Sequence, residues 1–418
     1  MREYTQILFI HQSFPSQYKH ILQALAGQAG HQLVGMGINP PAEPLPTGVT
    51  YVQYGLKRGN TPKLHEWLLD IDSKFVRGEA CARAAVQLRD QGFLPDLICA
   101  HPGWGEALFL KDVWPQARLL CYQEFFYHSQ GFDLDFDLEL QNQPDWELSA
   151  RTRLKNINPL MMLQASDWNV TPTAFQHSTF PDIWRPQITI IHDGVDTNLA
   201  SPSPVAKPMR LPDGTVIAAG EATVTFINRS LEPYRGCHIF LRAIPEIQRR
   251  LPLAQIVVVG DTEEVSYGWA APSGSWCDIF LAEIDGHYDP SRLHFTGLLT
   301  YSNYLQLLKL SACHVYLTYP FVLSWSLLEA MSSGCAIVGS ATPPVEEVIN
   351  HGQEGLLVDF FSPSQLADAV YQVLSDLPLA QNLRKHARAL ALRRFSIEQC
   401  VPQQLALMQL VLSGALSK

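Results

Sequence analysis

Short, continuously apolar runs alternate with amphipathic segments along almost the whole chain. In the first part we expect strands at residues 6–12, 31–37, 95–101, 117–123, 167–173 and 188–194. Runs that are apolar throughout, rather than at every second position, are typical of parallel strands covered on both faces. The segment 17–30 is predicted to be a helix closed by Gly30. This strand–helix–strand order predicts an open, doubly wound α/β sheet.

A second series of the same kind follows a proline-rich stretch. Residues 201–214, SPSPVAKPMRLPDG, contain four prolines and no periodic pattern, so they are predicted to be the interdomain linker. Beyond them we expect strands at residues 224–228, 255–261, 293–297, 313–319, 336–340 and 355–359. The predicted fold is therefore two Rossmann-like doubly wound domains, residues 1–200 and 215–395, that face each other across a cleft. Residues 396–418 are expected to form a last helix that packs across the domains.

Length and composition limit the classes of protein to consider. A chain of 418 residues is long enough for two large domains. Hydrophobic residues make up 47% and charged residues 17%, which excludes a mostly disordered chain. The formal net charge of −10 provides no basic surface, and this argues against nucleic acid as a partner.

The cysteine spacing and the hydropathy pattern indicate where in the cell the protein is located. No two of the eight cysteines lie within four residues of each other, which excludes a zinc knuckle and a CxxC redox pair. The chain begins MREYTQILFIHQSF, without the apolar core of a signal peptide, and contains no apolar run long enough to span a bilayer. We expect a cytoplasmic protein and leave peripheral membrane contact open.

The strongest candidate for chemistry is the loop, helix and strand of residues 320–340. Free backbone N–H groups at the start of the helix, near Ser324 and Trp325, form a site for an anion. Glu329 lies one to two turns further along, where its carboxylate can bind hydroxyl groups of the same ligand. The pattern predicts a site that binds an anionic group and hydroxyl groups of one ligand, and a plain surface glutamate is the alternative.

A second candidate is the segment 226–240, FINRSLEPYRGCHIF, which reads as a strand, a turn and a helix opened by Gly236. Arg229 leaves the end of the strand and Arg235 stands just before the helix. Two guanidinium groups beside a helix N-terminus suit a diphosphate, which arginine binds in a bidentate manner. A surface pair of salt-bridged arginines is the alternative.

In the first half of the chain, polar residues follow two predicted strands. His101 ends the strand 95–101 before a glycine-containing turn, and Glu124 follows the strand 117–123. Ligands of α/β sheets bind at the carboxyl ends of strands, so both residues are candidates for catalysis. A capping or core role for His101 stays open. At the first turn, the backbone N–H groups of Ser16 and Gln17 are candidate donors to a phosphate.

Several motifs together resemble a known family. IHDGVDTNLASP, FINRSLEPYRG, IVVVGD, LHFTG and SWSLLEAMSSGCAIVGS, in this order, resemble a family 4 retaining glycosyltransferase of the GT-B fold. HQSFPSQYKH, HPGWGE, YQEFFYH and RSLEPYRG resemble a bacterial subgroup whose substrates are mostly uncharacterised. The likeness is close over residues 223–359 and extends to the first half in layout. It implies an N-terminal acceptor domain, a C-terminal nucleotide-sugar domain, and transfer that keeps the anomeric configuration.

The resemblance also implies roles for residues and substrates. Arg229 and Arg235 would hold the donor diphosphate, and Glu329 the ribose hydroxyls. A UDP-sugar such as UDP-glucose is the first expected donor and GDP-mannose the second. The acceptor would be a carbohydrate, a lipid-linked molecule or a small molecule, and no cofactor is implied. The arginines and helix N-termini can stabilise the leaving diphosphate without a metal. The acidic segment 133–137 contains D-x-D patterns, but a surface loop is favoured over a metal site.

Two departures from the family pattern keep alternatives open. Phe321 stands where the family usually has a second glutamate, eight positions before Glu329. The two basic residues are both arginines and lie six positions apart, rather than arginine and lysine five apart. A non-catalytic nucleotide-sugar sensor or scaffold is one alternative, and a phosphorylase or epimerase on the same fold is another. A dinucleotide-binding dehydrogenase is disfavoured because Pro40 occupies the third glycine position after Gly35 and Gly37.

Overall fold

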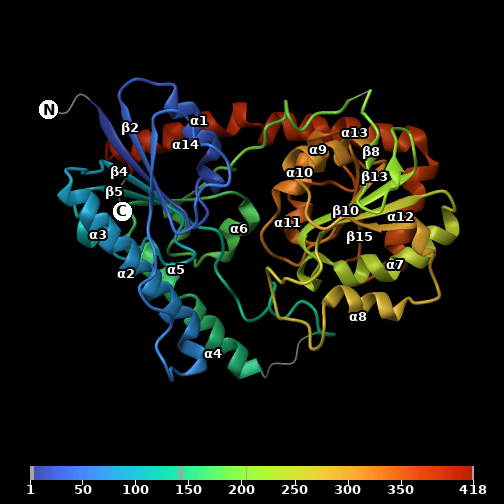
Figure 1. Cartoon of the computed structure of the whole chain (residues 1–418), viewed down its shortest axis with the longest axis horizontal. Helices are drawn as coiled ribbons and strands as arrows, with labels where there is room; N and C mark the ends of the chain where they lie inside the picture. The colour runs from blue at the N-terminus through green and yellow to red at the C-terminus, as the bar shows by residue number, and fades with distance from the viewer. Residues whose placement is uncertain (1–3, 141–144, 204, 417–418) are drawn as a thin grey trace. The chain divides into compact units, whose positions relative to one another are not determined.

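The computed structural model describes residues 4–140, 145–203 and 205–416. The chain divides into two compact units, each built on its own parallel sheet (Figure 1). The N-terminal unit comprises residues 1–194 and 397–418, and the C-terminal unit comprises residues 195–396. The expectation of two doubly wound α/β domains is confirmed. Within the described part of the chain, no helix is both long enough and apolar enough to cross a membrane.

The described residues of the N-terminal unit form a seven-stranded parallel sheet with the order β3-β2-β1-β4-β5-β6-β7. Its strands are β1 (Thr5–Ile10), β2 (His31–Gly37), β3 (Val49–Gln53), β4 (Leu97–Ala100), β5 (Arg118–Tyr122), β6 (Trp168–Thr171) and β7 (Ile188–Ile190). The strand order reverses between β1 and β4. The connections that leave these two strands therefore run in opposite directions, which opens a crevice at their carboxyl ends.

Helices cover both faces of this sheet. Those described in the unit are α1 (Lys19–Ala26), α2 (Leu69–Asp90), α3 (Leu110–Val113), α4 (Asp145–Lys155), α5 (Ile157–Ala165), α6 (Ala174–Thr179) and α14 (Ile397–Leu412), with 3₁₀ turns η1 (Ser16–Tyr18), η2 (Glu66–Leu68) and η3 (Arg185–Gln187). One buried cluster joins the sheet to α2, α3 and α5, and a second joins it to α1 and α14. Alternate residues of each strand enter opposite clusters, as Ile7 and Leu8 do, because successive side chains of a strand point to opposite faces.

The last helix differs from its expected role of packing across the domains. Helix α14 belongs to the N-terminal unit, where it lies against α1 and β5. Leu407, Met408 and Val411 are buried in the same cluster as Ile21 and Leu25. The helix therefore completes one face of the N-terminal sheet, because its apolar stripe matches the strand side chains that α1 leaves uncovered.

In the C-terminal unit, six of the described strands form a parallel sheet with the order β12-β11-β10-β13-β14-β15. These are β10 (Thr223–Ser230), β11 (Gln255–Asp261), β12 (Leu293–Phe295), β13 (Cys313–Tyr316), β14 (Ala336–Ser340) and β15 (Leu356–Val358). Here the order reverses between β10 and β13, so the second crevice lies at the carboxyl ends of these strands.

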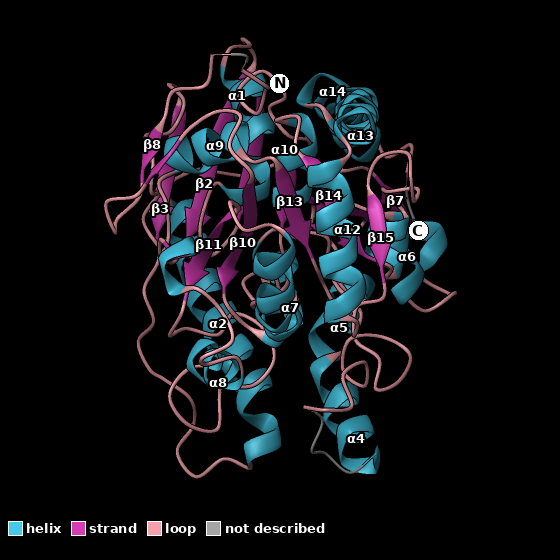
Figure 2. Cartoon of the chain, turned by 90° about the vertical axis from the view of Figure 1, so that its right-hand side faces the viewer, coloured by secondary structure: helices cyan, strands magenta, loops and turns pink. Residues whose placement is uncertain are grey.

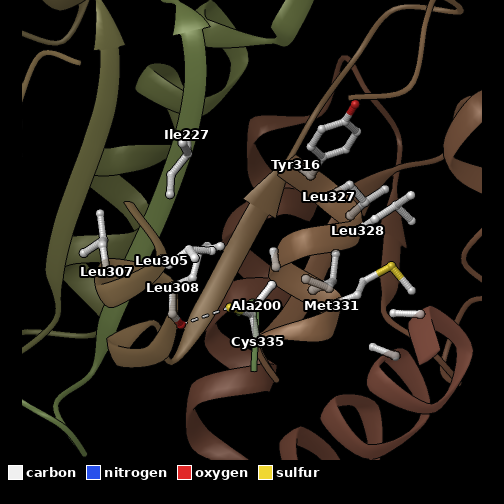
Figure 3. Packing of buried hydrophobic residues seen from close by; sticks show 14 of the residues in the cluster. Ala200, Ile227, Leu305, Leu307, Leu308, Tyr316, Leu327, Leu328, Met331 and Cys335 are labelled. Carbon is white, nitrogen blue, oxygen red and sulfur yellow. Dashed lines mark hydrogen bonds between the residues drawn. The ribbon is translucent and has the colours of Figure 1, made fainter. Parts of the chain in front are cut away.

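Helices again lie on both faces (Figures 1 and 2). The helices are α7 (Cys237–Arg250), α8 (Trp276–Glu283), α9 (Tyr301–Leu310), α10 (Trp325–Ser332), α11 (Pro343–Glu346), α12 (Pro363–Ser375) and α13 (Leu377–Leu390), with turns η4 (Pro233–Arg235), η5 (Pro290–Arg292) and the π-helical η6 (Ala391–Phe395). Figure 3 shows one face, where Ile227 of β10, Leu305 of α9 and Met331 of α10 belong to one buried cluster. On the other face, the ring of Phe226 stacks on Phe240 of α7 at a centroid distance of 4.4 Å.

The predicted linker 201–214 is wrong in its position. These residues belong to the C-terminal unit, in which β8 (Met209–Arg210) pairs with β9 (Val216–Ile217). Met209 and Leu211 are buried in the core of that unit. The proline-rich composition correctly indicated irregular backbone, but the apolar side chains within it find partners that lie far away in the sequence.

Apolar runs located most strands well. The predicted strands 31–37, 255–261 and 336–340 coincide with β2, β11 and β14 residue for residue. Strand β3 was not predicted because it lies at the edge of its sheet and is only half buried, so its sequence VTYVQ lacks a continuous apolar run.

The place of α14 leads to a stability prediction. Leu407 is 4% exposed against the sheet, whereas Leu410 on the same helix is 46% exposed. Leu407→Ala should lower the free energy of unfolding by about 3 kcal/mol, because a buried leucine leaves a cavity. Leu410→Ala serves as the matched control and should change it by less than about 0.5 kcal/mol. Urea denaturation followed by circular dichroism measures both, and equal effects would contradict the docked position of α14.

Candidate functional site

The crevice of the C-terminal unit begins with two arginines in different surroundings. Arg229, near the end of β10, is exposed, and no described residue forms a hydrogen bond or ion pair with it. Arg235 ends η4 and is only 7% exposed. Gly236 follows with φ of 70°, and a Cβ atom there would lie 2.4 Å from Cβ of Leu317. Only glycine can therefore connect η4 to α7 at this point.

The guanidinium of Arg235 is held at the end of β13. Its Nη1 donates hydrogen bonds to Oγ1 of Thr318 at 2.8 Å and to the carbonyl oxygen of Val322 at 2.9 Å. The guanidinium also lies 5.3 Å from the ring centroid of Tyr267 and 5.9 Å from that of Phe321. The structure thus brings Arg235 to the strand β13 that neighbours β10 across the switch in strand order.

Phe321, which replaces the expected glutamate, is buried in an aromatic cluster. Its ring meets those of Tyr234 and Tyr267 edge-on, at centroid distances of 5.5 and 5.0 Å. Edge-to-face pairs of this kind stabilise a packed arrangement. The residue therefore supports Arg235 through its ring and offers no carboxylate to a ligand.

Glu329 on α10 is oriented by two tyrosines. Its Oε1 accepts a hydrogen bond from the Tyr301 hydroxyl at 2.7 Å, and its Oε2 accepts one from the Tyr304 hydroxyl at 2.8 Å. Both tyrosines lie on α9. Their spacing of three residues places them on one helix face, and this was the sequence signal that motif analysis missed. The carboxylate is therefore fixed in direction.

The start of α10 is capped by its own serines. Oγ of Ser324 accepts hydrogen bonds from the backbone N–H and the hydroxyl of Ser326, at 3.3 and 2.9 Å. The N–H of Ser324 donates to the hydroxyl of Tyr316 at 2.8 Å. Trp325, the first residue of the helix, is exposed. The predicted helix N-terminus is thus present, with part of its donor capacity already used.

A carboxylate that sequence analysis did not single out is buried nearby. Oε2 of Glu232 accepts backbone hydrogen bonds from Ser266 at 2.6 Å and Tyr267 at 2.9 Å. Burial raises the pKa of Glu232 to about 7, although these N–H groups, Arg235 and Arg229 oppose the shift. Glu232 thereby ties the loop after β11 to the turn after β10.

In the N-terminal unit, His101 and Glu124 come together as expected. His101 follows β4, is 1% exposed, and its ring lies between those of Trp104 and Tyr122, at 4.6 and 5.3 Å. Burial, together with the neighbouring imidazole of His11, holds the pKa of His101 well below its usual range. Oε2 of Glu124 lies 3.9 Å from Nε2 of His101, so this is a contact with a neutral imidazole rather than an ion pair.

His11 completes this group, and sequence analysis did not select it. It follows β1 and is 4% exposed, and its ring centroid lies 5.3 Å from that of His101. Burial lowers its pKa to about 4, so the ring is neutral near pH 7. The available signal was its position directly after the first apolar run, on the strand that neighbours β4.

The first turn places Ser16 and Gln17 in η1, before α1. The side chain of Gln17 turns toward a small apolar pocket of about 30 Å³ that lies between the sheet, α1 and α14. Its lining comprises Gln17, Tyr18, Ile21, Cys99, Leu120, Tyr122, Val170, Asp193, Gln404, Leu407 and Met408. Contact of the backbone N–H groups of Ser16 and Gln17 with a ligand stays a prediction.

The acidic segment 133–137 uses its carboxylates locally. Asp135 accepts backbone hydrogen bonds from Gly131 at 2.8 Å and Phe132 at 3.3 Å, and Asp137 accepts one from Glu139 at 3.1 Å. Asp133 is buried. Among the described residues, no group of three metal-ligating side chains is present.

Glu232 leads to a prediction for the dependence of stability on pH. Its folded-state pKa of about 7 exceeds the ordinary value of 4.5, so the native state binds more protons between these pH values. Its contribution should therefore lower stability as pH rises from about 4.5 to 7, by on the order of 3 kcal/mol. In Glu232→Gln this component should vanish, whereas Glu263→Gln, at an exposed position of the same loop, should keep it. Urea denaturation at several pH values tests this, and parallel curves for wild type and Glu232→Gln would contradict it.

Comparisons with known proteins agree with this arrangement. Residues 29–200 match the model of the glycosyl transferase family 4 group, and residues 212–390 match that of glycosyl transferases group 1. The glycogen synthase of Mycobacterium tuberculosis is 23% identical over 384 residues, which cover 88% of this chain and 84% of that protein. The N-acetyl-alpha-D-glucosaminyl L-malate synthase of Bacillus anthracis is 29% identical over 150 residues, 36% of each chain.

Solved structures show the same fold. HepE of Anabaena, determined in complex with UDP-glucose, has a TM-score of 0.66 at 17% identity and covers 97% of this chain and 99% of its own. The sucrose-phosphate synthase of Thermosynechococcus elongatus has a TM-score of 0.70 at 16% identity, and the match covers 98% of this chain and 100% of that one. With two family models matched in succession on two doubly wound units, the chain belongs to the family 4 glycosyltransferases of the GT-B fold, enzymes that transfer a sugar from a nucleotide-sugar donor.

Proposed function

We propose that this enzyme transfers a hexose from a UDP-sugar to an acceptor hydroxyl, with retention of anomeric configuration and without a metal ion. The observation that supports it most is that Arg235, after β10, and Glu329, after β13, are each held in place by hydrogen bonds within the C-terminal unit. The UDP-glucose complex of the similar HepE supports a UDP-sugar, and GDP-mannose is the second candidate.

In this proposal both Arg235 and Arg229 bind the donor diphosphate. Arg235 is preorganised by Thr318 and Val322 and keeps further N–H groups for phosphate oxygens. Arg229 is exposed and supplies a second guanidinium. The N-terminus of α10 at Ser324 and Trp325 adds its dipole. Glu329, whose carboxylate is oriented by Tyr301 and Tyr304, accepts hydrogen bonds from the ribose hydroxyls.

The chemical step requires charge stabilisation at the leaving group. The bond between the anomeric carbon and the phosphate oxygen breaks, and a bond from that carbon to the acceptor oxygen forms on the same face. The acceptor proton passes to the departing diphosphate. Negative charge grows on the diphosphate as it leaves, and guanidinium groups fixed in advance stabilise it without reorganising.

The N-terminal unit is proposed to bind the acceptor. His101 and Glu124 lie at the carboxyl ends of β4 and β5, the edge where such sheets bind ligands. The backbone N–H groups of Ser16 and Gln17 are further candidate contacts. The acceptor class is a carbohydrate, a lipid-linked molecule or a small molecule. All eight cysteines are free and buried, which supports a reducing compartment, the cytoplasm.

A thermal-shift panel tests the donor. UDP, GDP, ADP, TDP and CMP are added separately, each with and without Mg²⁺. A nucleotide at 100 times its dissociation constant stabilises the native state by about 2.7 kcal/mol, which raises Tm by several degrees. We expect UDP to give this rise in the absence of Mg²⁺. A rise in Tm with GDP alone would identify a GDP-sugar as the donor. A rise in Tm that requires Mg²⁺ would contradict metal-free binding.

Substitutions test the residue roles. Arg235→Ala should reduce kcat about 10²-fold or more, because it removes a fixed donor to the leaving diphosphate. Glu329→Gln should weaken UDP binding about fivefold or more through the lost ribose contact. Arg249→Ala, at an exposed position of α7, is the matched control and should behave as wild type. Wild-type turnover in Arg235→Ala would overturn the diphosphate role.

A further inference from the structure

Two histidines lie side by side at the crevice of the N-terminal unit. Ile10 of β1 is in register with Ala100 of β4, so the next residues, His11 and His101, occupy equivalent positions beyond the two strand ends. Their rings meet edge-on at 5.3 Å with an interplanar angle of 76°. Trp104 contacts both rings, at centroid distances of 4.8 and 4.6 Å. The pair therefore occupies the point of the sheet at which the strand order reverses.

Backbone hydrogen bonds assign the same tautomer to both histidines. Nδ1 of His11 accepts the N–H of Ser13 at 2.9 Å, and Nδ1 of His101 accepts the N–H of Gly103 at 3.1 Å. A neutral imidazole carries one proton, so each proton is on Nε2. A Cβ atom at Gly103 would lie 2.8 Å from Cε1 of His101, so glycine is needed for this close approach.

Both Nε2–H groups lack a hydrogen-bond acceptor among the described residues, although both atoms are buried. An unpaired buried donor costs about 1–3 kcal/mol. Two such donors next to each other at the crevice of an enzyme point to a group that arrives with the substrate. Glu124, 3.9 Å from Nε2 of His101 and one-third exposed, adds a hydrogen-bond acceptor at the same place.

We propose that His11 and His101 bind one uncharged hydroxyl group of the substrate. Their Nε2–H groups donate hydrogen bonds to the hydroxyl oxygen, and the carboxylate of Glu124 accepts a hydrogen bond from the hydroxyl O–H. This inference rests on the proposed sugar transfer and assigns His11 a binding role in it. Because both imidazoles are neutral, neither histidine offsets the negative charge of the Glu124 carboxylate, and this charge disfavours an anionic group beside it. The hydroxyl belongs either to the hexose of the donor or to the acceptor.

Two variants of His11 separate binding from structure. In His11→Asn, the side-chain oxygen stands at the position of Nδ1 and still accepts the N–H of Ser13, but the Nε2–H donor is gone. In His11→Gln, an amide N–H reaches the position of Nε2 and the acceptor for Ser13 is lost. If His11 serves only to hold the Ser13 N–H, His11→Asn should retain more activity than His11→Gln. If its Nε2–H binds the substrate, His11→Gln should retain more activity. His31→Asn, at the opposite end of the same sheet, is the control.

Two measurements distinguish the source of the hydroxyl. Calorimetry gives the affinity for UDP and for UDP-glucose, and transfer of glucose to a pool of methyl glycosides gives the acceptor KM. If the hydroxyl is on the donor hexose, His11→Asn should weaken UDP-glucose about 5- to 10-fold and leave UDP unchanged. If it is on the acceptor, KM should rise by the same factor with UDP-glucose affinity unchanged. His11→Gln should recover part of either loss.

The charge argument has its own test. Glu124→Gln should reduce the preference for UDP-glucose over UDP-glucuronate, or for methyl glucosides over methyl glucuronides, because it removes the negative charge. An unchanged preference in both comparisons would overturn the placement of Glu124 at the hydroxyl.

The outcomes separate this inference from the function on which it rests. Unchanged UDP-glucose affinity in His11→Asn, together with an unchanged acceptor KM, overturns the inference while UDP binding stands. A wild-type protein that binds none of the nucleotides overturns the proposed function, and this inference with it.

Discussion

The reversal of strand order within each parallel sheet is the constraint on which the functional architecture depends. The connections after β1 and β4, and those after β10 and β13, leave in opposite directions, so the loops that follow these strands diverge at the carboxyl ends. The polar side chains with the most specific environments lie at these two places. Arg235 and Glu329 follow β10 and β13 in one unit, and His11 and His101 follow β1 and β4 in the other.

Burial then decides which of these groups carry charge. An imidazole loses its proton when it is desolvated, and the pKa values of His11 and His101 are accordingly lowered. In the other unit, the guanidinium of Arg235 lies over the rings of Tyr267 and Phe321. The two crevices therefore differ in kind: one offers a fixed positive charge suited to phosphate, and the other offers neutral donors suited to hydroxyls.

Support of functional groups by aromatic residues recurs in both units. Tyr301 and Tyr304 fix the carboxylate of Glu329, and Trp104 lies against both histidines. In the C-terminal unit, Phe321 stands where the family pattern led us to expect an acidic residue. Its ring packs beside the guanidinium of Arg235. At this position the difference from the family pattern leaves Arg235 and its hydrogen bonds in place.

Local sequence patterns determined the parallel-sheet architecture, most strand positions and the motif residues Arg229, Arg235 and Glu329, because periodicity and short motifs act within one element and its turn. The tertiary structure decided what depends on partners distant in the chain. It placed residues 201–214 in the C-terminal core and α14 on the N-terminal sheet, against the linker and bridging roles that composition predicted. It also paired His11 with His101, 90 positions away. No local pattern encodes such a pair, since strand order alone decides which strand ends become neighbours.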